Sequence, residues 1–379
     1  MRITGLSLVV ILSIPFCYGD VTTERSESAK LHEIFDRHWN REMRENPVWA
    51  SMLGDRRFNT EWGDLSPAAR QRRREGDMQA LQDLRTVDRE LLPPDEQVNY
   101  DLFERRYRVQ VEGWQYETFL MPIDQRGGIQ TLDETDDSLR FETVDDYEDW
   151  LARLGKVDTL MAQTIGLMEE GMEKGMMPPR ITMQRVPAQI EKQIVTDPSE
   201  SLFFKPFAEL PADFSEEQKA RIRREARRVI EGTVVPAYRK LLDFFEQEYL
   251  PACRDSVAAR DLPNGEAYYE FAVRRYTTTE MTPDEVHALG LREVARNRAE
   301  MLEVVKDVGF EGSLEEFFEH LRTDPKFYFE DADDLMNAYR ATAKQVDPKL
   351  VELFTRLQRM PYGVRKIPDS IALDTTTAY

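Results

Sequence analysis

The chain has 379 residues, and its 51 Lys and Arg against 71 Asp and Glu give a net charge of −20. Hydrophobic residues make up 41% and charged residues 32%, which is typical of a folded protein rather than a disordered one. The acidic excess argues against a nucleic-acid partner, because phosphate binding needs a local surplus of Lys and Arg.

Residues 1–19 have the pattern of a secretory signal peptide. One basic residue precedes an apolar run over residues 3–16, and small residues follow at Cys17 and Gly19. The run is shorter than the roughly 20 apolar residues that span a bilayer. We therefore predict cleavage after Gly19, no transmembrane span in the mature chain 20–379, and a periplasmic or secreted location.

The two cysteines bear on export. Cys17 raises a lipoprotein as an alternative, but Phe16 argues against it, because that processing site normally has a small residue there. Removal of the signal peptide would leave Cys253 without an intramolecular disulfide partner. With no His near it in sequence, we expect Cys253 to be a buried or unreactive thiol.

Helix signals follow one another along most of the mature chain and predict a mostly α fold, a multi-helix body with few strands. The first helix follows Ser26 and Ser28, another begins near Asp95, and one long helix runs from Thr143 towards Gly171. Further helix starts are predicted at N-caps or capping boxes: Ser66-Pro67, Ser215-Glu216-Glu217-Gln218, Thr282-Pro283-Asp284-Glu285 and Ser313-Leu314-Glu315-Glu316. A distortion is expected at Gly232 and Pro236.

The best strand signals lie near the carboxyl-terminal end, at residues 362–367 and 370–373. Residues 120–137, which include Gly127-Gly128, are expected to form a surface excursion. Because no long Gly/Ser-rich or Pro-rich linker interrupts the chain, we predict one helical domain over residues 20–379.

The four histidines do not form a metal-binding pattern. His32 and His38 are six residues apart, which turns them to different faces of a helix, whereas a metallopeptidase signature needs a spacing of four. We interpret them as packed or surface side chains. His287 and His320 have no second ligand at helical spacing, so no metal ligand is assigned.

Two further clusters have structural interpretations. Nine acids between Asp133 and Asp149 lack the central Gly of a calcium loop, so we interpret them as a solvated face. Methionines lie at helical spacing and are interpreted as core packing rather than a copper site: Met161, Met168, Met172 and Met176.

Several long segments resemble the bacterial domain of unknown function 885 family. The match includes Leu53-Gly54-Asp55-Arg56, Leu262-Pro263-Asn264-Gly265-Glu266, Tyr276-Thr277-Thr278-Thr279, Leu321-Arg322-Thr323-Asp324-Pro325 and the closing Asp374-Thr375-Thr376-Thr377-Ala378-Tyr379. The family is similar in plan to helical zinc metallopeptidases. That resemblance implies a cleft between helical halves, a peptide substrate and a zinc ion held by a His-Glu…His motif.

No His occurs after His320, so no catalytic or metal residue is carried over to this chain. We expect the amino-terminal portion of a family member, inactive alone, with zinc only in the full-length protein. Thr377 and Tyr379 are predicted to approach the substrate cleft. The alternative function is a non-catalytic helical binding or structural protein of the cell envelope.

Overall fold

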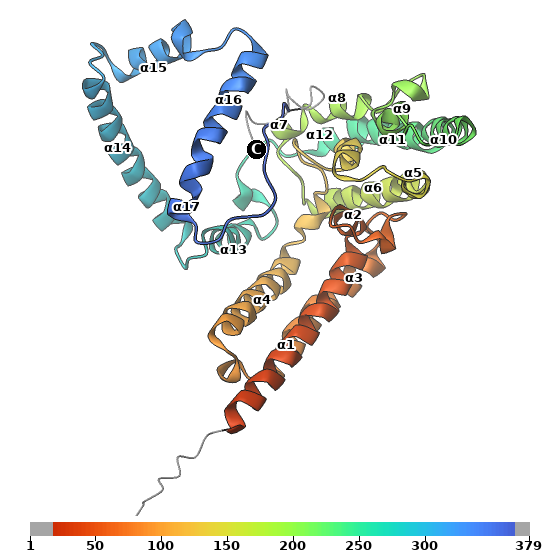
Figure 1. The fold of residues 1–379 in the computed structure, drawn as a ribbon, viewed down its shortest axis with the longest axis horizontal. Helices are drawn as coiled ribbons and strands as arrows, with labels where there is room; N and C mark the ends of the chain where they lie inside the picture. The colour runs from red at the N-terminus through yellow and green to blue at the C-terminus, as the bar shows by residue number, and fades with distance from the viewer. Residues whose placement is uncertain (1–17, 368–379) are drawn as a thin grey trace, which may run out of the picture. The chain divides into compact units, whose positions relative to one another are not determined.

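The computed structural model describes residues 18–367 and divides the chain into two compact units, with the boundary between Tyr276 and Thr277. Both units are helical (Figure 1), which confirms the mostly α prediction. No helix within the described range is long and apolar enough to cross a membrane. The expectation of one domain over residues 20–379 stays a prediction.

The described part of unit 1 contains α1 (Tyr18–Glu45), α2 (Pro47–Met52), α3 (Pro67–Leu84), α4 (Pro94–Gly113), α5 (Val144–Leu154), α6 (Val157–Lys174), α7 (Arg180–Met183), α8 (Val186–Glu191), α9 (Lys205–Ala208), α10 (Glu216–Val229), α11 (Val235–Phe244), α12 (Leu250–Ala252) and α13 (Gly265–Thr277). The described part of unit 2 contains α14 (Pro283–Asp307), α15 (Leu314–Thr323), α16 (Ala332–Val346) and α17 (Leu350–Leu353).

Shorter helical turns connect these elements. The 3-10 turns are Arg56–Phe58, Arg89–Leu91, Trp114–Tyr116, Thr118–Leu120, η5 (Ile129–Ser138), Pro198–Glu200, Leu202–Phe204, Ala259–Asp261, Pro325–Phe327 and Asp347–Lys349. Two π-helical turns, Ile230–Val234 and Phe245–Tyr249, flank α11. The first contains Gly232 and lies just before Pro236, where a distortion was expected.

Four predicted helix starts are confirmed by capping hydrogen bonds, whereas the first helix begins earlier than expected, at Tyr18 rather than after Ser26 and Ser28. Ser66 Oγ accepts from the backbone N–H of Ala69 at 3.3 Å and so begins α3. Ser215, Thr282 and Ser313 each form a complete capping box at the start of α10, α14 and α15. Such caps involve residues only three positions apart, so they form wherever the local sequence permits.

The predicted short strands near the carboxyl-terminal end are wrong for residues 362–367, which are irregular; residues 370–373 lie outside the described part of the chain. A strand forms only where a neighbouring strand pairs with its backbone, which sequence alternation by itself does not supply. The Tyr362 hydroxyl instead donates to the Ala343 carbonyl at 2.9 Å or to Asp347 Oδ1 at 2.8 Å. The described residues contain one isolated β-bridge, Pro179 with Arg254.

The single long helix predicted after Thr143 is two helices. The α5 helix ends at Gly155, and α6 begins after Lys156, whose φ of −110° and ψ of 8° are not helical. The Trp62 indole N–H donates to the Arg153 carbonyl at 2.7 Å. That contact comes from a residue 91 positions earlier in the chain, so helical periodicity could not predict it.

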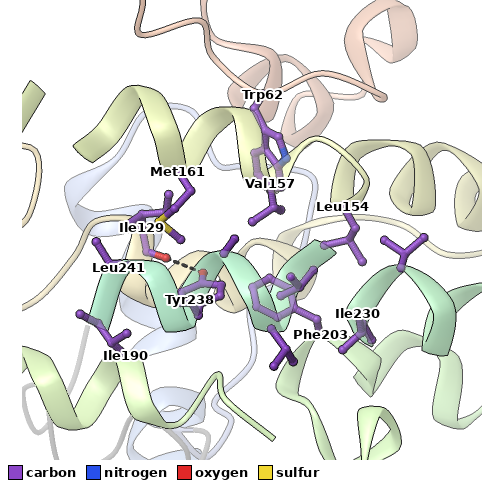
Figure 2. Packing of buried hydrophobic residues seen from close by; sticks show 14 of the residues in the cluster. Trp62, Ile129, Leu154, Val157, Met161, Ile190, Phe203, Ile230, Tyr238 and Leu241 are labelled. Carbon is purple, nitrogen blue, oxygen red and sulfur yellow. Dashed lines mark hydrogen bonds between the residues drawn. The ribbon is translucent and has the colours of Figure 1, made fainter. Parts of the chain in front are cut away.

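The main hydrophobic core of unit 1 lies where α10 packs on α5 and α11 packs on α6 and α8. Figure 2 shows Tyr238 at its centre, fully buried, with its hydroxyl donating to the Ile129 carbonyl at 2.6 Å. Ile123 and Ile129 are themselves buried. The predicted surface excursion at residues 120–137 is therefore partly anchored in the core, while Asp124, Gln125 and Arg126 are exposed as expected.

A second core joins α1 to the end of α3 and the turn that follows it. The α3 helix contacts both α1 and α4 (Figure 1). Leu31 and Ile34 of α1 pack against Leu84, Val87 and Leu92. This cluster extends the core of unit 1 along the amino-terminal helices.

The described part of unit 2 buries little apolar surface. Between Thr277 and residue 367, Val305 and Leu314 are its buried hydrophobic side chains. Large apolar side chains such as Leu291 and Val294 of α14 are more than half exposed, at 61% and 67%. Burial of one aliphatic side chain contributes about 1.5–3 kcal/mol, so this unit draws only a small stabilisation from its own core.

Candidate functional site

A pocket of about 340 Å³ lies where α2 and the turn after it meet α5 and the end of η5. Its walls carry both charged and aromatic groups: Ser51, Met52, Leu53, Gly54, Arg56, Asn59, Ser138, Leu139, Arg140, Phe141, Asp146, Asp149, Trp150 and Arg153. This volume lies at the lower end of the range for small-molecule sites. We call it the Arg153 pocket.

The wall from α2 is set by a glycine turn. Gly54 has a φ of +86°, and its N–H donates to the Ser51 carbonyl at 3.0 Å. The Asp55 N–H donates to the Ala50 carbonyl at 2.9 Å, which completes a Schellman motif. Nothing lies within 4 Å of a Cβ placed at Gly54, so the left-handed backbone, not crowding, favours glycine. The turn directs Arg56 into the pocket wall.

The opposite wall is one face of α5. The helix begins at Thr143, whose N–H donates to Asp146 Oδ2 at 2.7 Å in a capping box. Asp146, Asp149 and Arg153 follow at spacings of three and four residues, which places them along one face. Asp146, the capping-box partner of Thr143, is therefore itself a pocket residue.

Two aspartates neutralise the arginine opposite them. Asp146 Oδ1 lies 2.6 Å from Arg56 Nη1, and Asp149 Oδ2 lies 3.7 Å from Arg56 Nη2. Burial raises the pKa of Asp146, but its hydrogen bonds from Thr143 and Glu142 and the charge of Arg56 outweigh this and hold it below the usual value. Asp146 is therefore ionised at neutral pH.

Two charged residues of the pocket, Arg140 and Arg153, form no ion pair within the described chain. Arg140 is exposed, whereas Arg153 is buried. Its side chain is 1% exposed, and its Nη2 donates to Ser51 Oγ at 2.7 Å and to the Phe58 carbonyl at 3.0 Å. The buried Nε atom has no hydrogen-bond partner. The guanidinium also lies 5.5 Å from the Trp62 ring.

Burial makes the charged form of Arg153 less favourable but does not remove the charge. Burial lowers its pKa to about 10, and the charges of Asp149 and Glu61 offset only part of that effect. At neutral pH the group is still a cation. A buried cation with unused donors favours a negatively charged group in the pocket.

The histidines do not come together in a site. His32 Nε2 lies 2.7 Å from Glu96 Oε1, whereas His38 Nε2 lies 3.3 Å from Asp83 Oδ2. His38 is buried between the rings of Phe103 and Tyr107. The interpretation of this pair as a surface and a packed side chain is confirmed.

The carboxyl-terminal histidines have separate surroundings. His287 is exposed on α14. His320 stacks on Phe310 with ring centroids 5.3 Å apart. No group of three or more His, Cys, Asp or Glu able to hold a metal ion occurs among the described residues.

The acidic segment 133–149 is only partly the solvated face that was expected: Asp137, Glu142, Asp145 and Glu148 are exposed, but Asp136 is not. Asp136 is 5% exposed and both of its carboxylate oxygens lack hydrogen bonds, while Lys205 Nζ lies 3.6 Å away. Burial raises the pKa of Asp136 to about 7; Lys205 opposes this, and Asp137 and Asp133 add to it. Asp146 is also buried.

The remaining predictions concern packing and the carboxyl-terminal end. Met161 and Met168 are buried in the main core, and Met176 in a smaller cluster, so the packing interpretation is confirmed. Cys253 is a free, buried thiol. Thr377 and Tyr379, predicted near a substrate cleft, lie outside the described residues.

The Arg153 pocket was missed because its two walls are about 100 residues apart in sequence. A local signal did exist: Asp146, Asp149 and Arg153 lie at spacings of a helix face, directly after the helix start at Thr143. Periodicity identified that face as polar. It could not show that α2 would cover the face and bury Arg153.

A family model described as "Bacterial protein of unknown function (DUF885)" matches residues 47–379. Both walls of the Arg153 pocket lie within the matched range. A search of curated proteins finds no match.

Among solved structures, the chain is similar to the crystal structure of a protein from Colwellia psychrerythraea, described as "the putative lipoprotein". The TM-score is 0.78 with 18% sequence identity, so the likeness is one of fold. The match covers 87% of this chain and 60% of the neighbour, so this chain spans less than two thirds of the neighbour's length.

Proposed function

Because the chain belongs to the DUF885 family of bacterial proteins, we propose that it supplies the substrate-binding wall of an exported, peptidase-like hydrolase. In this proposal, unit 1 binds a peptide in the Arg153 pocket. The reacting centre, with its zinc ion, would belong to the longer protein. The observation that carries the proposal is the polar pocket in unit 1, which joins Arg153 to hydrogen-bonding and aromatic groups in one cavity.

The chemistry of the walls suits a peptide. Ser51, Asn59 and the arginines offer hydrogen bonds to a peptide backbone, while Phe141 and Trp150 offer apolar contact to a side chain. Three arginines against two aspartates make the pocket locally positive in a chain of net charge −20. A ligand with both polar and apolar parts would therefore find complementary groups.

The protein is exported, to the periplasm or outside the cell. Residues 1–19 predict this location, and the description of the structural neighbour as a lipoprotein accords with it. A substrate-binding role in that compartment fits a peptide present outside the cytoplasm.

The test separates binding from turnover. The 379-residue chain should bind short peptides in isothermal titration calorimetry, without bound zinc in elemental analysis. The longest available reading frame should hold one zinc ion per chain and cleave the same peptides in a chelator-sensitive reaction. If the longer protein holds no zinc, the hydrolase proposal fails. A tight one-to-one zinc site in the 379-residue chain would contradict the placement of the zinc ion outside this chain and would make His32 and His38 candidate ligands.

A second candidate is a non-catalytic binding or structural protein of the cell envelope. The exposed apolar side chains of unit 2, including Leu291 and Val294 on α14, favour it, because such surface commonly contacts another protein. This candidate predicts peptide or protein binding with no cleavage, even by the longest reading frame.

A further inference from the structure

We propose that the Arg153 pocket binds the terminal carboxylate of its ligand, together with an apolar last side chain. The inference rests on the proposed function, because it specifies which part of a peptide this pocket would take. Arg153 would bind the carboxylate, and the aromatic wall would contact the side chain of the same residue.

The positive charge is present before a ligand arrives. Arg153 is 1% exposed, has no carboxylate ion pair in the described chain, and leaves its Nε atom without a partner. Removing a guanidinium from water costs free energy that only hydrogen bonds and an opposite charge recover. Ser51 and Phe58 satisfy Nη2 with neutral oxygens, and no carboxylate of the described chain lies within ion-pair distance, so the charge is only partly compensated.

The other arginine at the centre of the pocket cannot replace it. Arg56 is already neutralised by Asp146 at 2.6 Å and by Asp149 at 3.7 Å. Arg140 is exposed at the rim, where water screens its charge. Of the three arginines, Arg153 is therefore the one that would stabilise a bound carboxylate most.

A singly charged anion fits better than a phosphate. Asp146 and Asp149 stay in the pocket wall and would repel a second negative charge on the ligand. A carboxylate matches the planar fork of a guanidinium and carries one charge. Neutral groups of the ligand could still hydrogen-bond to Ser51 and Asn59.

The apolar part of the wall identifies the neighbouring ligand group. Phe141 and Trp150 lie in contact range of each other, with ring centroids 6.3 Å apart, and both line the cavity with Leu139 and Met52. A cavity of about 340 Å³ accommodates one large side chain with its carboxylate rather than a long segment. An aromatic or aliphatic last residue therefore suits the site.

The first experiment compares two ligands that differ in one group. The 379-residue chain is titrated with N-acetyl-alanyl-phenylalanine as the free acid and as its carboxyl-terminal amide. We expect the acid to bind at least about tenfold more tightly, the gain typical of a charge-assisted pair. Equal affinity for both overturns this inference but leaves peptide binding intact. Binding of neither peptide overturns both this inference and the proposed binding role.

Variants then test the charge that is responsible. Arg153→Lys keeps the charge but loses the planar fork, and Arg153→Gln loses both. Acid binding should therefore weaken in that order, and by a larger factor than amide binding. Arg140→Gln removes the same charge at the exposed rim and serves as the matched control. Equal losses in the Arg140 and Arg153 variants would show nonspecific attraction and overturn the inference.

Because Arg153 is buried, its variants could unfold, and circular dichroism is measured for each. Asp149→Asn provides a test that does not touch Arg153: its oxygen can still accept from Asn59, now 3.2 Å away, while a repelling charge is lost. We expect Asp149→Asn to raise the affinity for the acid severalfold more than the affinity for the amide. Unchanged or weaker acid binding would overturn the carboxylate assignment.

Discussion

Trp62 and Arg153 contact each other through two different groups. The indole N–H of Trp62 donates to the backbone carbonyl of Arg153 at 2.7 Å, and the Arg153 guanidinium lies 5.5 Å from the Trp62 ring. The first contact lies at the end of α5, and the second helps to position the cation beside the pocket. One tryptophan thus connects the helix break with the candidate ligand site.

Trp62→Phe should destabilise unit 1 by about 1–3 kcal/mol, because the buried Arg153 carbonyl loses the indole N–H that donates to it. Urea unfolding followed by circular dichroism measures the change. Trp49→Phe is the control, since Trp49 is 50% exposed. Equal midpoints for Trp62→Phe and the parent chain would show that the Trp62 hydrogen bond contributes nothing measurable.

Tyr238→Phe should also cost about 1–3 kcal/mol, because it deletes the donor to the Ile129 carbonyl while keeping the ring. Tyr249→Phe is a buried control: the Tyr249 hydroxyl has no hydrogen-bond partner, so its loss should be neutral or stabilising. The pair is compared by urea unfolding. A larger loss in Tyr249→Phe than in Tyr238→Phe would contradict this assignment of the buried hydroxyls.

Two glycines of α6 should respond to alanine in opposite directions. A Cβ at Gly171 would lie 2.7 Å from the Leu120 carbonyl oxygen, so Gly171→Ala should destabilise by roughly 1–3 kcal/mol. A Cβ at Gly166 meets nothing within 4 Å, so Gly166→Ala should stabilise the helix by about 0.5–1 kcal/mol. Thermal unfolding distinguishes them, and stabilisation by both variants would argue against close packing of α6 on Leu120.

Asp136 should make unit 1 less stable as the pH rises. Its folded pKa of about 7 lies above the value near 3.9 of an unfolded Asp. Between these values the folded state holds the proton more tightly, so the free energy of unfolding falls as pH increases from about 4 to 7. Above pH 7 the full cost is present, and below pH 4 it is absent.

Asp136→Asn removes this titration. The variant should gain on the order of 4 kcal/mol relative to the parent chain at pH 8, because each of the roughly three pKa units corresponds to about 1.4 kcal/mol, with little difference at pH 4. Urea unfolding at both values measures the difference, and Asp213→Asn is an exposed control. A pH-independent effect of Asp136→Asn would mean that Lys205 keeps the carboxylate ionised throughout.

Local sequence predicted the helical punctuation well. Ser66, Ser215, Thr282 and Ser313 all cap helices as expected, because each cap forms between residues three positions apart. The helix start at Thr143 was correct for the same reason. Family membership, too, follows from sequence, through the match over residues 47–379.

What tertiary structure decided depends on distant contacts. Trp62 reaches Arg153 across 91 positions, and Tyr238 reaches Ile129 across 109, so neither the break after α5 nor the burial of η5 had a local signal. A strand also depends on pairing with a neighbouring strand, and residues 362–367 are irregular rather than the strand that their sequence suggested. The sequence alone thus determined the helical class, the helix-capping residues and the family to which the chain belongs. Packing of α2 against α5 decided which charge is buried, and burial is what turns Arg153 from a surface cation into a candidate binding group.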